Sequence, residues 1–404
     1  MSWGYEERVR RILVNASNVT GAGARSSTLQ FAPALTRAMP QALFSLVLPD
    51  QPDFRSLPLP SHARAIYVPR PRGLTGAKRR LQELFLTVPQ LARQTKADVC
   101  LTLGDLGAIG LPCPQVVLLR QPLLVYDRRE MGGLAGWHPI KGWYLAWHFG
   151  LSARRSAYVV VQTPVMAERL ARRYGLDRRR IVVIPQALLL EVAPGEPDSS
   201  GHPVVSACAK SIKLLFLAAY YPHKNHAILP AVAAEIKRRR LESQVQIFLT
   251  LDSSEMQRAR LGDVLRPHAD VVTNLGRLSR SEVAPALRAS TALFLPTLLE
   301  SYGNIYLEAL ACGRRILTSD RDFARWMCRG LALYFDPLNA VSIVDAIEAL
   351  PKTSSDDEAY AAVAGQHLST FPRDWDEVAA RFAEVLAKCL PTSASSWTPD
   401  GGVR

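Results

Sequence analysis

Two carboxylates that bracket a glycine turn are the residues of this sequence best suited to chemistry. Glu300 and Glu308 are separated by seven residues, with Gly303 between them. The apolar run at 291–296 predicts a buried strand before the turn, and apolar residues at helical spacing predict a helix at 305–312. A strand, a glycine turn and a helix in that order direct backbone N–H groups and a helix dipole at a ligand, most naturally a phosphate. Because carboxylates only accept hydrogen bonds, two of them beside such a turn favour a sugar nucleotide.

The pattern from Glu300 to Gly313 resembles a known family. It reads Glu-x7-Glu and closes with Glu-Ala-Leu-Ala-Cys-Gly. It is similar to the retaining GT-B glycosyltransferases of the glycosyltransferase family 4 (group 1) type, which include bacterial cell-envelope polysaccharide and lipopolysaccharide enzymes. The resemblance extends from about residue 98 to residue 386 and is looser before that. The alternative is that both glutamates are merely exposed charges that flank a helix. In that case the strand, the glycine and the helix around them would have no functional meaning.

The resemblance implies an α/β protein of GT-B fold. Its two Rossmann-like, doubly wound domains would face each other across a cleft, and a C-terminal helix would cross back to the first domain. Alternating strand and helix patterns in both halves of the chain agree with parallel sheets covered by helices. The expected divisions are an acceptor-binding domain at 1–190, a linker at 191–210, a nucleotide-sugar-binding domain at 211–372, a crossover helix at 373–390 and a disordered tail at 391–404.

The resemblance also implies roles for the residues of the turn. Glu308 would hold the ribose of the donor, Glu300 would bind sugar hydroxyls and act in catalysis, and Gly303 would approach phosphate. The other residues of the turn that are expected in the donor site are Ser301, Tyr302, Asn304 and Ile305.

Lys224 is the expected source of positive charge for catalysis. It follows the first predicted strand of the second half, at the start of a helix, where its charge can stabilise a leaving diphosphate. In the resemblance it matches the lysine of an Arg-x(4–5)-Lys motif, but Ala218 and Ala219 stand where the arginine is expected. Tyr220, Tyr221 or His223 could fill the space of that arginine, and Arg277 could supply its charge in the donor site. The alternative for Lys224 is an ordinary lysine at a helix start.

Three residues of the first half are also candidates. Gly21 and Gly23 follow the first predicted strand and look like the glycine loop by which this family approaches the donor diphosphate. Gln121 follows a later strand, where the resemblance implies a polar residue next to the reacting sugar, and it is therefore the candidate catalytic residue there. The alternatives are a common glycine turn and a plain loop at a strand end.

Composition limits the compartment and the cofactors. Neither an uninterrupted apolar run long enough to cross a bilayer nor a secretory leader is present in the sequence, and the six cysteines lack metal-site spacing. We therefore expect a reduced, cytoplasmic protein. Asp320 and Asp322 have the spacing of a metal-binding pair but are interpreted as a helix N-terminus, so we expect neither a metal nor a cofactor besides the donor substrate.

The net charge of +13 requires an anionic partner or a solvated basic surface. Nucleic acid is disfavoured because no motif for its recognition is found. The basic segment at 78–86, with Trp143 and Trp147 elsewhere in the same half, suggests peripheral binding to the inner face of the cell membrane. Ordinary helix packing and a basic face that aids solubility remain open as alternatives.

The first hypothesis is a metal-independent hexosyltransferase. It would move a hexose from a nucleoside diphosphate sugar to a saccharide or lipid-linked acceptor, with retention, in cell-envelope polysaccharide biosynthesis. The alternatives are a nucleotide-sugar epimerase or phosphorylase on the same scaffold, and a non-catalytic interaction protein, which the missing arginine makes conceivable.

Overall fold

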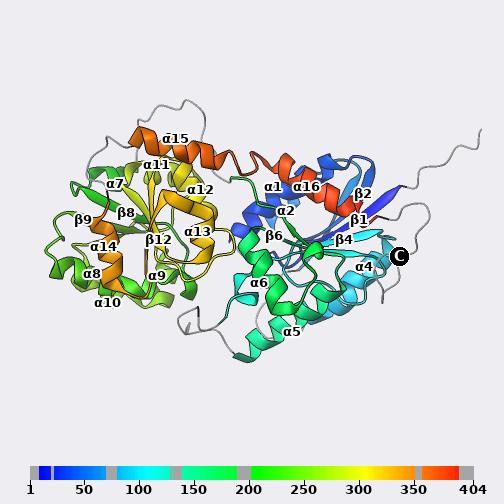
Figure 1. The fold of residues 1–404 in the computed structure, drawn as a ribbon. Helices are drawn as coiled ribbons and strands as arrows, with labels where there is room; N and C mark the ends of the chain where they lie inside the picture. Colours follow the sequence, from blue (N-terminus) through cyan, green and yellow to red (C-terminus); the bar gives the residue numbers. More distant parts are fainter. Residues whose placement is uncertain are drawn as a thin grey trace, which may run out of the picture. The chain divides into compact units, whose positions relative to one another are not determined.

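A computed structural model describes residues 9–19, 22–69, 80–127, 130, 139–188, 202–350 and 357–390. The chain divides into two units, each built on a parallel sheet with helices on both faces (Figure 1). The first unit comprises Met1–Val125, His138–Ala187 and Pro372–Arg404, and the second comprises Tyr126–Trp137 and Leu188–Phe371.

The sheet of the first unit has seven parallel strands in the order β3-β2-β1-β4-β5-β6-β7. The strands are β1 (Arg10–Asn15), β2 (Ala42–Pro49), β3 (Ala63–Val68), β4 (Val99–Thr102), β5 (Gln115–Leu118), β6 (Tyr158–Val161) and β7 (Ile181–Val183). The residues of β4 and β5 in the middle of the sheet are all buried, as parallel strands covered on both faces require, whereas the edge strand β3 is partly exposed. The strand order reverses between β1 and β4, so ligands are expected beyond the carboxyl ends of the strands at that point.

The helical elements of the first unit connect these strands. They are α1 (Ala22–Ala38), α2 (Pro52–Arg55), the π-helical turn η1 (Glu83–Thr87), α4 (Val88–Gln94), η2 (Pro122–Leu124), α5 (Pro139–Arg155), α6 (Pro164–Tyr174), η3 (Arg178–Arg180) and α16 (Trp375–Ala387). Thr163 caps α6 by accepting a hydrogen bond from the N–H of Met166 at 3.1 Å, and Gly175 ends it at φ +62°. The sequence predicts both ends of this helix.

The last helix of the chain, α16, packs on α1 in the first unit (Figure 1). Val378, Phe382 and Val385 form its buried stripe. Phe382 meets Phe31 of α1 edge to face at 4.8 Å between ring centroids. Since the preceding helix belongs to the second unit, the chain returns to the first unit at its end, as the resemblance implies.

The sheet of the second unit has six parallel strands in the order β10-β9-β8-β11-β12-β13. The strands are β8 (Ile212–Phe216), β9 (Val245–Leu249), β10 (Val272–Asn274), β11 (Ala292–Leu295), β12 (Arg315–Ser319) and β13 (Ala332–Phe335). Apolar runs in the sequence predict strands at 214–217, 245–249, 271–275, 293–296, 316–318 and 331–335, and each observed strand overlaps one of these ranges. The order reverses between β8 and β11, which places the loops after these two strands at the expected ligand edge.

The helices of the second unit surround its sheet. They are α7 (Pro203–Ala207), η4 (Pro222–Lys224), η5 (His226–Ile228), α8 (Leu229–Arg238), α9 (Ser253–Ala259), α10 (Leu261–Leu265), η6 (Arg266–His268), α11 (Arg280–Ala289), α12 (Asn304–Ala311), α13 (Asp322–Cys328), η7 (Arg329–Leu331), α14 (Ala340–Glu348) and α15 (Asp357–Leu368). None of the helices in the described part of the chain is long and apolar enough to span a membrane.

Three sequence predictions differ from the structure. The sequence pattern at 255–265 predicts one helix, but the structure has α9 and α10 there, because Arg260 adopts a left-handed φ of +53° between them. The predicted linker contains α7, which is fixed by a hydrogen bond from the N–H of His202 to the carbonyl of Pro285 at 3.2 Å. The sequence predicts a loop at 15–25 and a helix from residue 26, but α1 already begins at Ala22. The remainder of that linker and the predicted tail lie outside the described residues.

Candidate functional site

Lys224 and Glu300 come together at the ligand edge of the second unit. Lys224 ends the turn η4 after β8, and Glu300 lies in the loop after β11. Their side chains form an ion pair and are only 17% and 11% exposed. The two loops are also joined through the carbonyl of His223, which accepts hydrogen bonds from the N–H of Leu298 at 2.7 Å and the hydroxyl of Thr297 at 3.1 Å. Backbone contacts therefore fix the loop that carries Lys224, and the ion pair with Glu300 holds its ammonium group.

The residue after Lys224 holds the same loop. Asn225 has a left-handed φ of +63°, which asparagine tolerates better than most residues. Its side-chain amide donates to the carbonyl of Pro337 at 2.8 Å. This contact ties the Lys224 loop to the segment that follows β13.

Gly303 allows the helix α12 to begin directly after the Glu300 loop. It caps α12 with φ +75°, and a Cβ at this position would lie 2.7 Å from ring carbons of Tyr306. The buried Tyr306 ring is fixed by a 2.8 Å hydrogen bond between its hydroxyl and that of Thr318. Only glycine both adopts this left-handed φ readily and leaves room for the Tyr306 ring. The first N–H groups of α12, those of Asn304 and Ile305, have no partner within the helix, as at every helix start.

Glu308 lies one turn into α12 and is buried at 5% exposure. Its carboxylate accepts hydrogen bonds from Arg280 Nη1 at 3.1 Å and Asn304 Nδ2 at 3.3 Å. Burial raises the pKa of Glu308, while the charge of Arg280 and the two hydrogen bonds oppose that rise. Arg280 is the residue that the sequence analysis missed. It begins α11, and only its proximity to the start of a helix was visible in the sequence.

Arg277 lies close to the segment in which the expected arginine is missing. Its Nη2 is 3.0 Å from Asp252 Oδ2 and 3.2 Å from Glu255 Oε1. The same Glu255 oxygen accepts the N–H of Tyr220 at 3.2 Å. Arg277 is thus connected through Glu255 to the loop that contains Ala218 and Ala219.

Two further residues of the turn, Tyr302 and Ser301, differ in how deeply they are buried. The side chain of Tyr302 is buried, with its ring edge to face against Phe371 at 6.3 Å between centroids. Ser301 is half-buried. Tyr302 therefore positions the turn through core packing rather than through an exposed hydroxyl.

The candidates of the first half belong to the other unit. Gln121 is the N-cap of η2, and its N–H donates to Asp105 Oδ1 at 3.0 Å; the N–H of Arg120 donates to the same oxygen at 2.6 Å. Burial raises the pKa of Asp105, and the charge of Arg120 opposes that rise. Gly23 lies in the first turn of α1 instead of in a glycine loop, because the helix starts at Ala22. Gly21 lies outside the described residues.

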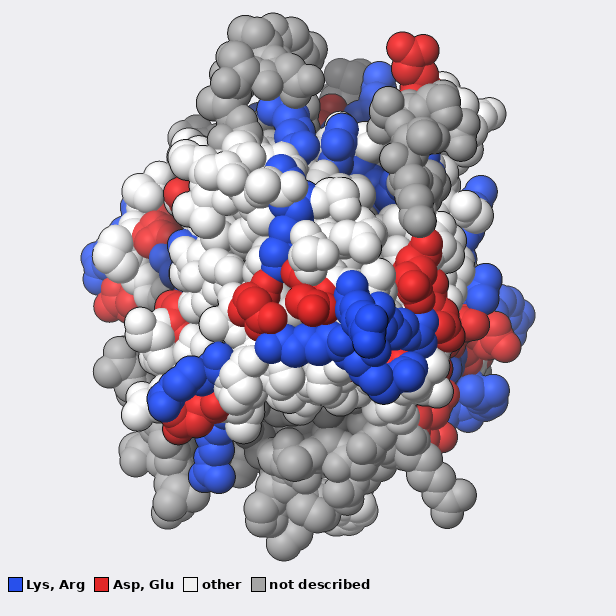
Figure 2. Space-filling view, turned by 90° about the vertical axis from the view of Figure 1, so that its left-hand side faces the viewer, with Lys and Arg blue, Asp and Glu red and all other residues white. Residues whose placement is uncertain are grey.

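Acidic residues accompany the basic ones on the surface. On one face of the molecule blue and red side chains alternate, with a concentration of basic groups beside acidic ones (Figure 2). Arg239 of α8, for example, is within 2.7 Å of Glu235, 2.6 Å of Asp345 and 2.5 Å of Glu348. In the described part of the chain no group of three or more metal-ligating side chains is present; Asp320 pairs with Arg325 at 2.7 Å, and Asp322 begins α13.

Comparison with known proteins identifies a family match within the second unit. Residues 211–352 match the family described as Glycosyl transferases group 1. The D-inositol 3-phosphate glycosyltransferase of Paenarthrobacter aurescens is 25% identical over 56% of this chain and 56% of its own length. The phosphatidyl-myo-inositol mannosyltransferase of Mycobacterium leprae is 25% identical over 56% of this chain and 59% of its own length. The chain thus spans little more than half the length of these relatives.

Solved structures show the fold. Anabaena HepE, determined in complex with UDP and glucose, superposes with a TM-score of 0.66 at 16% identity over 94% of this chain and all of that one. The sucrose-phosphate synthase of Thermosynechococcus elongatus gives a TM-score of 0.64 at 15% identity, covering 94% and 98% of the two chains. The protein therefore has a two-domain GT-B fold.

Proposed function

Because this chain carries a domain of the group 1 glycosyl transferases, we propose that it transfers a hexose from a nucleoside diphosphate sugar to a saccharide or lipid-linked acceptor. The observation that carries the proposal is the arrangement at the ligand edge of the second unit. There the Lys224–Glu300 ion pair, the start of α12 at Gly303 and the buried Glu308 follow β8 and β11, where the strand order reverses. The structure of Anabaena HepE was determined in complex with UDP and glucose, which supports this class of donor.

Different residues of this edge would bind different parts of the donor. Lys224 and the first N–H groups of α12 would bind the diphosphate, since both supply positive charge. Glu308 would accept hydrogen bonds from the ribose, with Arg280 holding its carboxylate in place. Glu300, already fixed by Lys224, would accept hydrogen bonds from the sugar hydroxyls.

The proposed reaction is retaining and needs no metal. The bond between the anomeric carbon and the diphosphate oxygen breaks, and the acceptor oxygen bonds to the same face of that carbon. The proton of the acceptor passes to the departing diphosphate. Lys224 stabilises the negative charge that grows on the leaving group, and fixed charges of this kind commonly contribute several kcal/mol. Gln121 of the first unit would contact the reacting sugar.

The direct test is calorimetric titration with UDP, GDP and ADP, without added metal. We expect one nucleotide to bind selectively and Glu308→Ala to lose that binding. Glu348→Ala is the matched control, since this glutamate lies on the surface helix α14. If no nucleotide binds, the non-catalytic alternative replaces the proposal; if the Glu308 variant binds normally, the site is assigned wrongly.

We also propose that the protein works in the cytoplasm at the inner face of the membrane, in cell-envelope polysaccharide synthesis. Exposed apolar side chains support this: Trp143 is 69% exposed, Trp147 50% and Leu86 61%. The elements that carry them are neighbours, because Phe85 of η1 meets His148 of α5 at 5.4 Å between ring centroids. The helix α5 contains no acidic residue and ends with two arginines, which suits an anionic surface.

Flotation with liposomes tests the membrane proposal. The protein should float with vesicles that contain acidic phospholipid and should be released by salt, whereas neutral vesicles should retain little. Trp143→Ala combined with Trp147→Ala should weaken the association. Failure to bind acidic vesicles at low salt would overturn the membrane proposal and would leave the proposed transfer reaction untouched.

A further inference from the structure

His223 lies beside the Lys224–Glu300 ion pair at the ligand edge of the second unit. It is the middle residue of the turn η4, and its backbone carbonyl accepts two hydrogen bonds from the loop after β11. Because the strand order reverses between β8 and β11, this histidine is held at the point where α/β sheets bind ligands. The proposed reaction leaves its side chain unused.

The half-buried side chain of His223 has an aromatic neighbour and two charged ones. Its ring is stacked on that of Tyr221, the N-cap of η4, at 5.5 Å between centroids and 21° between planes. The other titratable or charged groups around it are Lys224 of the same turn, Glu300 of the loop after β11 and His226 of η5. Within the described part of the chain, neither ring nitrogen of His223 forms a hydrogen bond. The imidazole can therefore bind a ligand without giving up a protein partner.

The cations discussed for this edge are already paired with carboxylates. Lys224 pairs with Glu300, Arg280 pairs with Glu308 at 3.1 Å, and Arg277 contacts two carboxylates at 3.0 Å and 3.2 Å. A bound diphosphate would add negative charge to this balanced set. A neutral group that can gain a proton there would offset part of the added charge.

His223 is neutral at pH 7 in the free protein. Burial, together with the charge of Lys224, lowers the pKa of His223 to about 4, and the charge of Glu300 opposes this effect. A diphosphate beside the ring would raise that pKa, because a nearby negative charge favours the protonated imidazole. The stacked ring of Tyr221 would also stabilise an imidazolium through its π-electron face.

We propose that His223 binds the donor diphosphate directly and takes up a proton from the solvent as the donor binds. The protonated ring would donate a charge-assisted hydrogen bond to a phosphate oxygen beside Lys224. It would thereby supply the positive charge that is missing because Ala218 and Ala219 stand where an arginine is expected. Identifying the anion as the donor diphosphate rests on the proposed function, which this inference deepens by adding a residue that contacts the leaving group.

Nuclear magnetic resonance of the full chain with isotope-labelled histidine rings follows this proton directly. The variant His223→Gln identifies the signal of His223 among the eight histidines. Without ligand, the ring should stay largely neutral between pH 5 and 8. With saturating UDP, GDP or ADP, whichever binds, its pKa should rise by about two pH units or more. A ring that stays neutral down to pH 5 in the complex would overturn the proposal.

The affinity for the nucleotide should report the same proton. A pKa that is higher in the complex makes binding tighter as the pH falls, because proton and ligand binding are reciprocally linked. Between pH 7.5 and 5.5, the affinity of the natural chain relative to His223→Gln should therefore rise about fourfold or more in calorimetric titrations. Taking this ratio removes the effect of protons that bind to the nucleotide itself. A ratio that does not change with pH would count against His223.

The control for these titrations is His268→Gln. His268 ends η6, which precedes β10, so it lies at the opposite edge of the same sheet. This variant should keep the pH dependence of the natural chain. If it instead loses that dependence as His223→Gln does, the proton is not taken up at His223 and the assignment is wrong.

A permanently charged side chain separates the effect of charge from that of packing. At pH 7.5, His223→Lys should bind the nucleotide about threefold or more tightly than His223→Gln, because only the lysine offers a cation to the phosphate. Its affinity relative to His223→Gln should not rise further as the pH falls. If the lysine variant binds no better than the glutamine variant, a positive charge at this position does not contact the anion.

Inorganic pyrophosphate distinguishes failure of this inference from failure of the proposed function. If a nucleotide binds and the pKa of His223 does not rise, the inference fails alone. If pyrophosphate raises that pKa and no nucleotide binds, the proposed transfer reaction fails while His223 remains a diphosphate ligand. If neither anion binds, both proposals are wrong.

Discussion

Lys224 and Glu300 form an ion pair between the loops that follow β8 and β11, two neighbouring strands. The pair is largely buried, so each partner compensates the desolvation of the other. A diphosphate bound at the start of α12 would share the ammonium group with Glu300. In that arrangement one lysine connects the leaving group of the donor with the carboxylate proposed to bind its sugar.

Replacing Lys224 by alanine should lower turnover more than donor affinity. The variant loses the fixed charge that would stabilise the leaving diphosphate, so we expect kcat to fall about 100-fold or more. Initial rates of sugar transfer at saturating donor measure this effect. Lys237→Ala is the control, since Lys237 pairs with Asp270 at the surface of the same unit, 2.7 Å away. A Lys224 variant with nearly normal kcat would contradict the catalytic role.

Two glycines with left-handed backbone allow strain and steric clash to be separated. Gly303→Ala adds backbone strain at φ +75° and a Cβ that lies 2.7 Å from the Tyr306 ring. Gly313→Ala adds strain at φ +65° with no atom within 4 Å. We expect Gly313→Ala to cost about 1 kcal/mol of unfolding free energy and Gly303→Ala about 1–3 kcal/mol more. Urea unfolding measures both, and equal losses would show that the Tyr306 ring moves aside freely.

Two histidines next to the candidate site, the buried His226 and the half-buried His223, should make stability depend on pH. Burial lowers the pKa of His226 to about 3 and that of His223 to about 4, both from 6.5. The unfolded chain binds these protons at higher pH than the folded chain does. The stabilisation is therefore present above pH 6.5 and is lost as the pH falls toward 4, by about 1–3 kcal/mol for each histidine.

The variant His226→Phe tests that dependence. The His226 ring stacks on Phe216 at 4.3 Å between centroids, so phenylalanine keeps an aromatic contact without a titrating group. Urea midpoints measured at pH 7.5, 6 and 5 should fall less steeply in the variant than in the natural chain. Identical slopes would show that His226 does not contribute.

Arg277 should support donor binding from its place beside Glu255. Arg277→Ala leaves the buried Glu255 without this cation, and Glu255 also holds the N–H of Tyr220 next to Ala219. We expect nucleotide affinity to fall about three- to tenfold, in line with the loss of one charged contact. Calorimetry measures the affinity, with Arg266→Ala as the exposed control on the same unit. Unchanged affinity would mean that Arg277 does not replace the missing arginine.

Local patterns in the sequence were sufficient to predict the strand and the helix at the ligand edge of the second unit. The apolar run before Glu300, the glycine at 303 and the helical spacing after it depend on neighbouring residues, and the structure has the predicted strand and helix there. Contacts between distant segments were not visible. The hydrogen bond of Arg280 to Glu308 spans 28 residues, and the ion pair of Lys224 with Glu300 spans 76.

In the first unit, prediction from the sequence failed for a different reason. Gly23 was interpreted as part of a phosphate loop because its place after the first strand resembles the glycine loop of the family, yet it lies in α1. A glycine followed by small residues does not prevent a helix when the next turns bury an apolar face, as Phe31 and Leu35 do. The role of Asp105 beneath Arg120 and Gln121 was also missed, because it depends on two loops meeting at the edge of a sheet.

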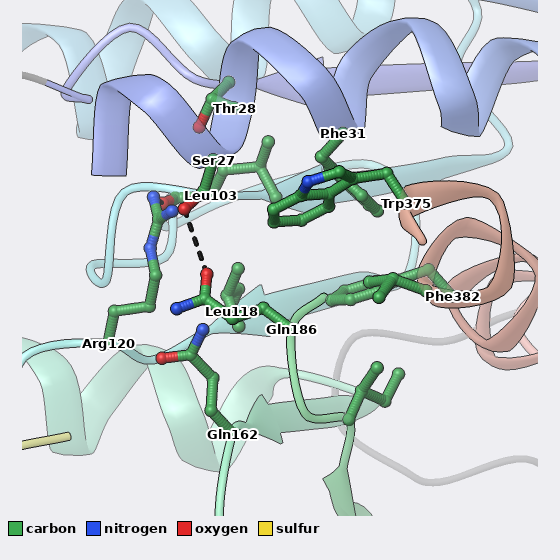
Figure 3. A pocket seen from close by; sticks show the side chains of 12 residues that line it. Ser27, Thr28, Phe31, Leu103, Leu118, Arg120, Gln162, Gln186, Trp375 and Phe382 are labelled. Carbon is green, nitrogen blue, oxygen red and sulfur yellow. Dashed lines mark hydrogen bonds between the residues drawn. The ribbon is translucent and has the colours of Figure 1, made fainter. Parts of the chain in front are cut away.

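The return of α16 to the first unit should make the stability of that unit depend on the end of the chain. Phe382 is 3% exposed and packs on Phe31 (Figure 3), so Phe382→Ala should cost about 3–5 kcal/mol. Phe371→Ala is the matched control in the second unit, where this ring meets Tyr302 and Trp326. Calorimetric scans should show the Phe382 variant lowering the transition of the first unit and leaving nucleotide-induced stabilisation of the second intact. The Phe371 variant should lower the transition of the second unit and leave that of the first unit unchanged. If both variants shift the same transition equally, the two units unfold as one, and α16 stabilises the whole chain instead of the unit on which it packs.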